Sequence, residues 1–214
     1  SASNDELREK LNLIRRIGDM KQKLSYRAPA ENAVVPEKSG AKLLGQLEGK
    51  YRSLEQADQL ISSAQKDLAI YALWGDFSGE PLQKMCEAGW DVRFFASPDN
   101  AYQAGWEEKY DLFLINESGG QKYFVVIGPQ GKEEAFPDAD LFVFPPITAE
   151  KLRDRIHDTE EDIRNINEYL DAVAPEAIEL LEQYRLELFE DVDHMRVVGA
   201  SDSLLEDKIR AIEG

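Results

Sequence analysis

Apolar side chains recur at helical spacing in the last third of the chain. Seven positions follow one another at intervals of four and three residues: Leu152, Ile156, Thr159, Ile163, Ile166, Leu170 and Val173. Such a heptad repeat with charged residues between its members predicts a coiled-coil helix. Thr148 follows two prolines and suits the N-cap position, so the helix is expected to begin near residue 149.

The first third of the chain carries two further helical stripes. A shorter stripe at Leu7, Leu11, Ile14 and Ile17 predicts a helix that ends near Arg27. The residues that follow, 28–40, contain prolines and end in Ser39-Gly40, which predicts a break. Beyond it, positions recur at intervals of three and four with one polar interruption at Asp58: Leu44, Leu47, Tyr51, Leu54, Asp58 and Ile61.

The two heptad segments have the same length, because 41–66 and 150–175 each contain 26 residues. If they run antiparallel, the break at 28–40 lies opposite Pro175, and the outer segments 4–27 and 176–200 pair in turn. A proline inside a helix removes a hydrogen bond and produces a kink. Pro36 and Pro175 are therefore hinge candidates in a bent, antiparallel, two-arm coiled coil.

The middle third has shorter apolar runs and more aromatic residues, which predicts a small α/β lobe with a mainly antiparallel sheet of about four strands. A chain of this kind belongs to the α+β class. The expected elements are a helix after Ser78 that buries Leu82, Met85 and Cys86, a strand at Val92–Phe95, a weak helix at Asn100–Tyr110, a hairpin of Leu112–Ile115 with Tyr123–Ile127 around residues 117–120, and a strand at Leu141–Phe144.

Four segments follow from these patterns: a first coiled-coil arm at 1–66 broken at 28–40, a lobe at 67–149, a returning arm at 150–200 kinked near 175, and a tail at 201–214. The tail is ambiguous. Gly199 is expected to end the arm, after which Ser203 and Glu206 form a capping box for a short helix, or Lys208–Glu213 begins a strand.

Composition and charge narrow the function. With 43% apolar residues and a net charge of −17, the chain is expected to be folded, soluble and acidic. An acidic surface repels phosphate and anionic lipid, so neither nucleic acid nor bare membrane is expected as the main partner, and no apolar run is long enough to span a bilayer. The segments 1–66, 67–149 and 150–214 carry +3, −9 and −11, so the two arms should attract each other.

The chain offers few residues for chemistry. His157 with Glu161, and Asp191 with Asp193 and His194, lie on acidic helices and are interpreted as solvated faces rather than metal sites. The single Cys86 cannot form an internal disulfide, which favours a reducing compartment, and it is interpreted as a core residue. Residues 128–131 are interpreted as a β-turn. No catalytic, metal or cofactor site and no small-molecule substrate is predicted.

Trp74-Gly75-Asp76-Phe77 joins the first arm to the lobe and has two interpretations. In the first, Trp74 and Phe77 pack in an elbow where Asp76 turns the chain. In the second, these aromatic side chains anchor a partner. The start of the chain, Ser1-Ala2-Ser3-Asn4, has neither an initiator Met nor a signal-peptide core, so we expect an excised piece of a longer protein.

The order of these features resembles the bacterial V-type ATPase subunit I, which is similar to subunit a of the eukaryotic enzyme. The resemblance covers most of residues 67–190 in order and spacing. It is carried by the long helix, Trp74-Gly75-Asp76-Phe77, a helix ending in Glu87-Ala88-Gly89, Val92-Arg93-Phe94-Phe95, Ile115-Asn116, Gly119-Gly120-Gln121-Lys122-Tyr123-Phe124-Val125-Val126 and the acidic heptad helix.

The resemblance implies a distal lobe with both coiled-coil arms, in which residues 201–214 begin the return into a missing second lobe. It favours the strand interpretation at the C-terminus. It also implies a non-catalytic stator at the cytoplasmic face of a membrane, with the helical heterodimer of the peripheral stalk as partner and a membrane domain later in the parent chain. The alternatives are a free-standing coiled-coil adaptor or chaperone and a ligand-binding α/β enzyme domain.

Overall fold

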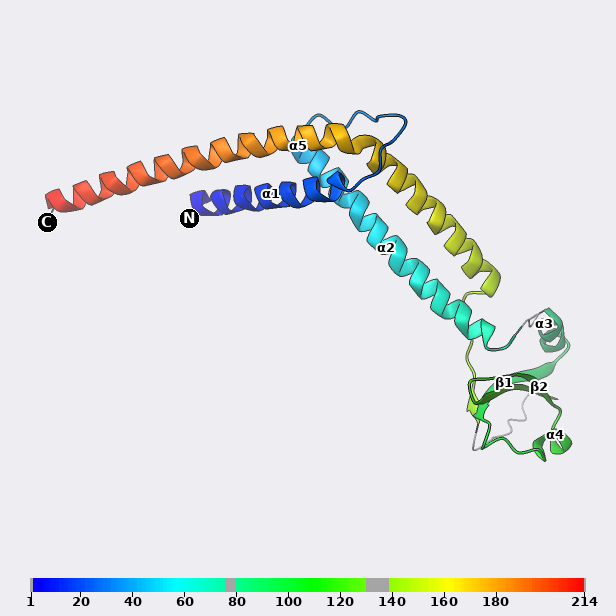
Figure 1. Cartoon of the computed structure of the whole chain (residues 1–214). Coiled ribbons are helices and arrows are strands. Elements are labelled where there is room, and N and C mark those ends of the chain that lie inside the picture. Colours follow the sequence, from blue (N-terminus) through cyan, green and yellow to red (C-terminus); the bar gives the residue numbers. More distant parts are fainter. Residues whose placement is uncertain (1, 76–79, 130–138, 214) are drawn as a thin grey trace. The chain divides into compact units, whose positions relative to one another are not determined.

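The computed structural model of the chain describes residues 2–75, 80–129 and 139–213 (Figure 1). It confirms the α+β class, with long helices and one four-stranded antiparallel sheet. The chain forms two compact units. The helical unit contains Ser1–Asp58 and Glu160–Gly214, and the sheet unit contains Gln59–Thr159.

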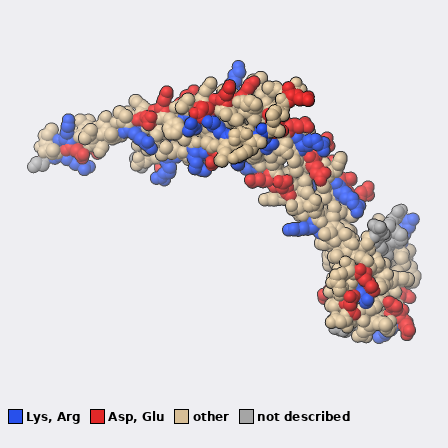
Figure 2. Space-filling view, in the orientation of Figure 1, with Lys and Arg blue, Asp and Glu red and all other residues tan. Residues whose placement is uncertain are grey.

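Three helices build the helical unit: α1 (Ala2–Ser25), the first part of α2 (Gly40–Ala72) and most of α5 (Ala149–Glu213). Helix α1 runs antiparallel to the second half of α5 (Figure 1), because Lys10 contacts Asp191 and Lys21 contacts Glu182. In Figure 2 many acidic side chains lie along α5 and basic side chains lie along α1. The predicted attraction between the first and last thirds of the chain is therefore confirmed within this unit.

Helix α5 begins where its predicted cap places it, and α2 also begins after a capping residue. The Thr148 Oγ1 accepts a hydrogen bond from the Lys151 N–H at 3.2 Å, which fixes the start of α5 at Ala149. The Ser39 Oγ accepts from the Lys42 N–H at 3.4 Å, and the Ser39 carbonyl accepts from the Leu43 N–H at 2.8 Å. Helix α2 therefore begins at Gly40, the last residue of the predicted break.

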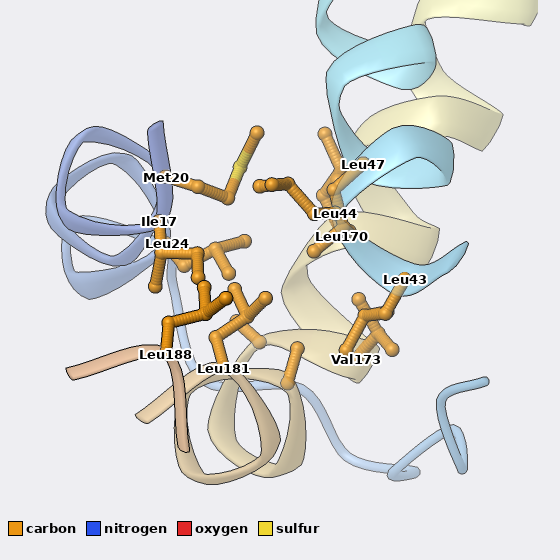
Figure 3. Packing of buried hydrophobic residues seen from close by; sticks show 12 residues of the cluster. Ile17, Met20, Leu24, Leu43, Leu44, Leu47, Leu170, Val173, Leu181 and Leu188 are labelled. Atoms are coloured by element: carbon orange, nitrogen blue, oxygen red, sulfur yellow. The ribbon is translucent and has the colours of Figure 1, made fainter. Parts of the chain in front are cut away.

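The helical unit has a core to which all three helices contribute (Figure 3). In that view Leu24 and Ile17 of α1 face Leu181 and Leu188 of α5, and Leu43 of α2 lies beside Val173. The predicted seam positions of α2 and α5 are buried or half-buried, except for Asp58, which is exposed. The fully or nearly buried core residues are Ile17, Met20, Leu24, Leu43, Leu44, Leu47, Leu170, Val173, Ala174, Ala177, Leu181 and Leu188.

Two predictions about the end of α5 were wrong, because the helix runs without a break through Gly199 to Glu213. Pro175 lies inside α5 without ending it. Figure 1 shows that α5 is bent between its yellow and orange parts. One glycine costs a helix only about 1 kcal/mol, which is too little to end it among good helix formers. Residues 201–213 are helical, so neither a separately capped short helix nor a strand at Lys208–Glu213 forms. Helix α2 also ends later than predicted, at Ala72.

The sheet unit contains β1 (Trp90–Pro98), β2 (Leu112–Ser118), β3 (Gln121–Pro129) and β4 (Asp140–Leu141), in the order β2-β3-β1-β4. The predicted hairpin is confirmed: β2 and β3 are joined by Gly119 and Gly120, whose φ angles of 59° and 77° suit a tight turn that glycine adopts readily. A bulge separates Leu114 from Asn116 in β2.

Apolar clusters cover both faces of the sheet. One face packs Phe95, Phe124 and Val126 against Trp106 of the single-turn helix α4 (Trp106–Lys109). The opposite face packs Tyr123 and Val125 against Trp74. The sheet therefore holds the end of α2 through the residue that directly follows it.

The remaining elements of the sheet unit differ from the sequence prediction in three ways. The weak helix expected at Asn100–Tyr110 is reduced to α4, because the chain turns up to Gly105. The strand expected at Leu141–Phe144 is shorter than predicted and ends at Leu141, although the Phe142 N–H still donates to the Phe94 carbonyl; Pro145 and Pro146 follow and cannot donate to a sheet. Helix α3 (Glu80–Glu87) forms where it was expected, but Cys86 is exposed and not part of a core.

Within the ranges described here, none of the helices has an apolar stretch long enough to span a membrane.

Candidate functional site

The site with the most specific geometry lies in the helical unit, where the connector of residues 26–39 passes the bend of α5. Pro175 has no N–H, so the Asp171 carbonyl one turn earlier has no helical donor. The Val34 N–H donates to the Ala172 carbonyl at 3.1 Å. The connector is therefore hydrogen-bonded to the backbone of α5 directly beside the carbonyl that Pro175 leaves without a helical donor. Pro36 is buried beyond this contact.

Arg27, which follows α1, contacts both α2 and α5 near the contact between Val34 and Ala172. Its guanidinium donates to Asn167 Oδ1 at 2.7 Å and to the Tyr51 hydroxyl at 3.1 Å, and it lies 3.6 Å from the carboxylate of Asp171. It also lies over the Tyr51 ring, 5.2 Å from the centroid. Asp171 precedes Pro175 by one helical turn. One side chain thus connects the end of α1, the middle of α2 and the bend of α5.

A two-pronged ion pair connects α1 to α2. The Arg16 guanidinium donates from Nε to Glu48 Oε2 at 3.0 Å and from Nη2 to Glu48 Oε1. These hydrogen bonds lower the pKa of Glu48 and raise that of Arg16, against the opposing effect of partial burial. Planar, two-point contacts of this kind fix geometry as well as charge.

A second cluster connects α1 to α5. Glu182 accepts hydrogen bonds from Arg185 at 2.9 Å and from Lys21, and these contacts lower the pKa of Glu182 to about 2. Arg185 belongs to the same helix, while Lys21 comes from α1. The carboxylate therefore stays charged at any physiological pH and holds the two helices in register.

The start of α2 approaches α5 closely. A Cβ atom built on Gly40 would lie 2.5 Å from Cγ of Tyr184, well inside van der Waals contact. Further along, the Lys50 ammonium lies 5.2 Å from the centroid of the Tyr169 ring. Because the residue numbers on α2 rise as those on α5 fall, the two helices are antiparallel here.

The connector and α5 border an open depression of about 680 Å³. Its polar lining comes from Glu31, Asn32, Asn165, Glu168 and Asp171. Asp171 is already paired with Arg27. Among the described residues that line it there is no histidine, cysteine, serine or lysine.

In the sheet unit, Trp74 lies at the centre of an aromatic cluster and is 1% exposed. Its ring centroid lies 5.0 Å from that of Phe94, 5.2 Å from Phe142 and 5.5 Å from Tyr123. Its side chain is therefore packed, as the elbow interpretation predicts, and offers no surface to a partner. Among the described atoms its Nε1 has no hydrogen-bond partner.

Hydrogen bonds from side chains to backbone carbonyls hold the chain in place beside Trp74. The Asn116 side-chain amide donates to the Leu73 carbonyl at 2.7 Å, and the Tyr71 hydroxyl donates to the Ile147 carbonyl at 2.7 Å. Gly75 turns the chain with φ = 73°. Asp76 and Phe77, the other two residues predicted at this site, lie outside the described residues.

The metal candidates do not form a site in the part of the chain that the structure describes, where no group of three or more His, Cys, Asp or Glu side chains converges. His157, Glu161, Asp191, Asp193 and His194 are all exposed. Asp191 instead pairs with Lys10 at 3.3 Å.

Sequence reasoning missed the residues that fix the junction. Arg27 was recognised only as a helix end, because a basic residue at that place is already explained by the helix dipole. The contact of Val34 with Ala172 has no sequence signal, because any non-proline residue supplies a backbone N–H. Gly40 was recognised as part of a break, not as a point of close approach.

Comparison of the chain with models of protein families, with curated proteins and with solved structures finds no match.

Proposed function

We propose that this chain is a non-catalytic stator region of a rotary V-type ATPase or ATP synthase. In such a machine a rotor exerts torque on a held assembly, and the held part has to resist bending. The observation that supports this role is the helical unit, in which α1, α2 and α5 bury one continuous core and are joined by ion pairs at three levels.

Stiffness follows from the type of contact. Antiparallel helices with interdigitating apolar seams resist sliding, because a shift of one turn moves every seam residue out of its place. The contacts of Arg27 and Val34 add polar constraints at the bend of α5, where a helix with a proline is weakest. Both effects favour a mechanical role that requires no chemistry.

The proposed partner is the helical heterodimer of the peripheral stalk, which the resemblance of residues 67–190 to subunit I implies. The segment 67–149 carries a net charge of −9. We therefore propose that the lobe meets a basic stretch of that heterodimer, with electrostatic attraction that selects the partner and speeds association. In the complete enzyme this region would connect the peripheral stalk to the membrane part.

A direct binding experiment tests this proposal. The intact chain is passed over immobilised peripheral-stalk heterodimer from a bacterial V-type ATPase. We expect saturable binding with a Kd below about 10 µM that weakens about tenfold between 50 and 300 mM salt. A folded chain that shows no binding at about 100 µM would contradict the proposal.

Matched charge reversals locate the contact. Glu87→Lys with Glu108→Lys changes two exposed positions of the sheet unit, and Glu190→Lys with Asp193→Lys changes two exposed positions of α5. The first pair should weaken binding and the second should leave it unchanged. Equal effects of the two pairs would show that net charge alone attracts the heterodimer, and the lobe would lose its proposed role.

The adaptor alternative predicts a different result. A free-standing adaptor or chaperone would bind unfolded or partly folded clients and would not distinguish the peripheral-stalk heterodimer from an unrelated helical dimer of similar charge. An unrelated basic coiled coil is therefore the second surface in the same experiment. Equal binding to both surfaces would favour the adaptor.

A further inference from the structure

We draw no further inference here: the strongest candidate, the row of exposed aliphatic side chains from Val197 to Ile212 in the last turns of α5, supports no proposal, because nothing in the described parts of the structure shows what covers it.

Discussion

Gly40 packs against the aromatic ring of Tyr184 so closely that no side-chain carbon fits between them. A Cβ atom on Gly40 would lie 2.5 Å from Cγ and 2.6 Å from Cβ of Tyr184. Gly40 is the first residue of α2, and Tyr184 packs against the core of the helical unit. The glycine therefore sets how closely α2 approaches α5.

Gly40→Ala should destabilise the chain by about 1–3 kcal/mol, because α2 or the Tyr184 ring has to move. The matched control is Gly45→Ala on the same helix, where a Cβ atom meets nothing within 4 Å. That change should stabilise the chain by about 0.5–1 kcal/mol through helix propensity. Thermal unfolding followed at 222 nm measures both. Equal effects of the two variants would contradict the close approach.

Pro175→Ala should straighten α5, since the new N–H replaces the missing helical donor. The hinge hypothesis then predicts a larger radius of gyration in solution scattering. The Val34 N–H should also exchange with solvent about five- to tenfold faster, because its bond to the Ala172 carbonyl is weakened. Pro29→Ala, in the exposed part of the connector, is the control. An unchanged radius would refute the role of Pro175 as the hinge, and Pro36 would remain an untested candidate.

Glu182 makes the chain sensitive to acid in a defined range. Its pKa is lowered to about 2 from the ordinary 4.5, by hydrogen bonds from Arg185 and Lys21. A lowered pKa means that the folded state releases this proton more readily than the unfolded state. The stabilisation is therefore complete above about pH 4.5 and is lost as the pH falls toward 2.

Glu182→Gln should destabilise the chain by about 0.5–1 kcal/mol at pH 7, a modest value because the pair is partly solvated. It should also reduce the fall in melting temperature between pH 6 and pH 3. Glu190→Gln, an exposed position of the same helix, should change neither quantity. If both variants show the same pH dependence as the unaltered chain, the cluster of Lys21, Glu182 and Arg185 does not hold the helices in register.

Substitutions of Trp74 test how much the aromatic cluster around it stabilises the sheet unit. Trp74→Ala should destabilise this unit by about 3–5 kcal/mol, because it leaves a cavity among four aromatic rings. Trp74→Phe should have a clearly smaller effect, because it also removes the buried Nε1–H that has no partner among the described atoms. Chemical denaturation followed by near-ultraviolet circular dichroism measures the free energy of unfolding of both variants. A Trp74→Ala variant as stable as Trp74→Phe would contradict the central packing of this residue.

The heptad positions made the long helices predictable. Leu152, Leu170 and Val173 occupy buried seam positions because a spacing of three and four residues has one interpretation in an otherwise charged segment. The hairpin was predictable for a similar reason, since Gly119-Gly120 between two apolar runs allows few turns.

The sequence pattern did not predict where α5 ends, whether Cys86 is buried or how Trp74 packs, because these depend on contacts between distant residues. Proline and glycine often end helices, but α5 continues through both Pro175 and Gly199. Cys86 has an apolar neighbour in Met85 and yet is exposed, because a short helix of eight residues covers little of the sheet. The sequence allowed two interpretations of Trp74, a packed residue or an anchor for a partner. Its four aromatic neighbours show that the side chain is packed.

The central claim is that the two ends of the chain form one rigid antiparallel body. Spin labels at Asn12 of α1 and Glu190 of α5, in a Cys86→Ser background, measure this directly by double electron–electron resonance. Packed helices lie about 8–10 Å apart, so we expect a single narrow distribution centred between about 20 and 30 Å once the label arms are included. A broad distribution extending beyond about 40 Å would show that the ends are apart, and the stator account would be wrong.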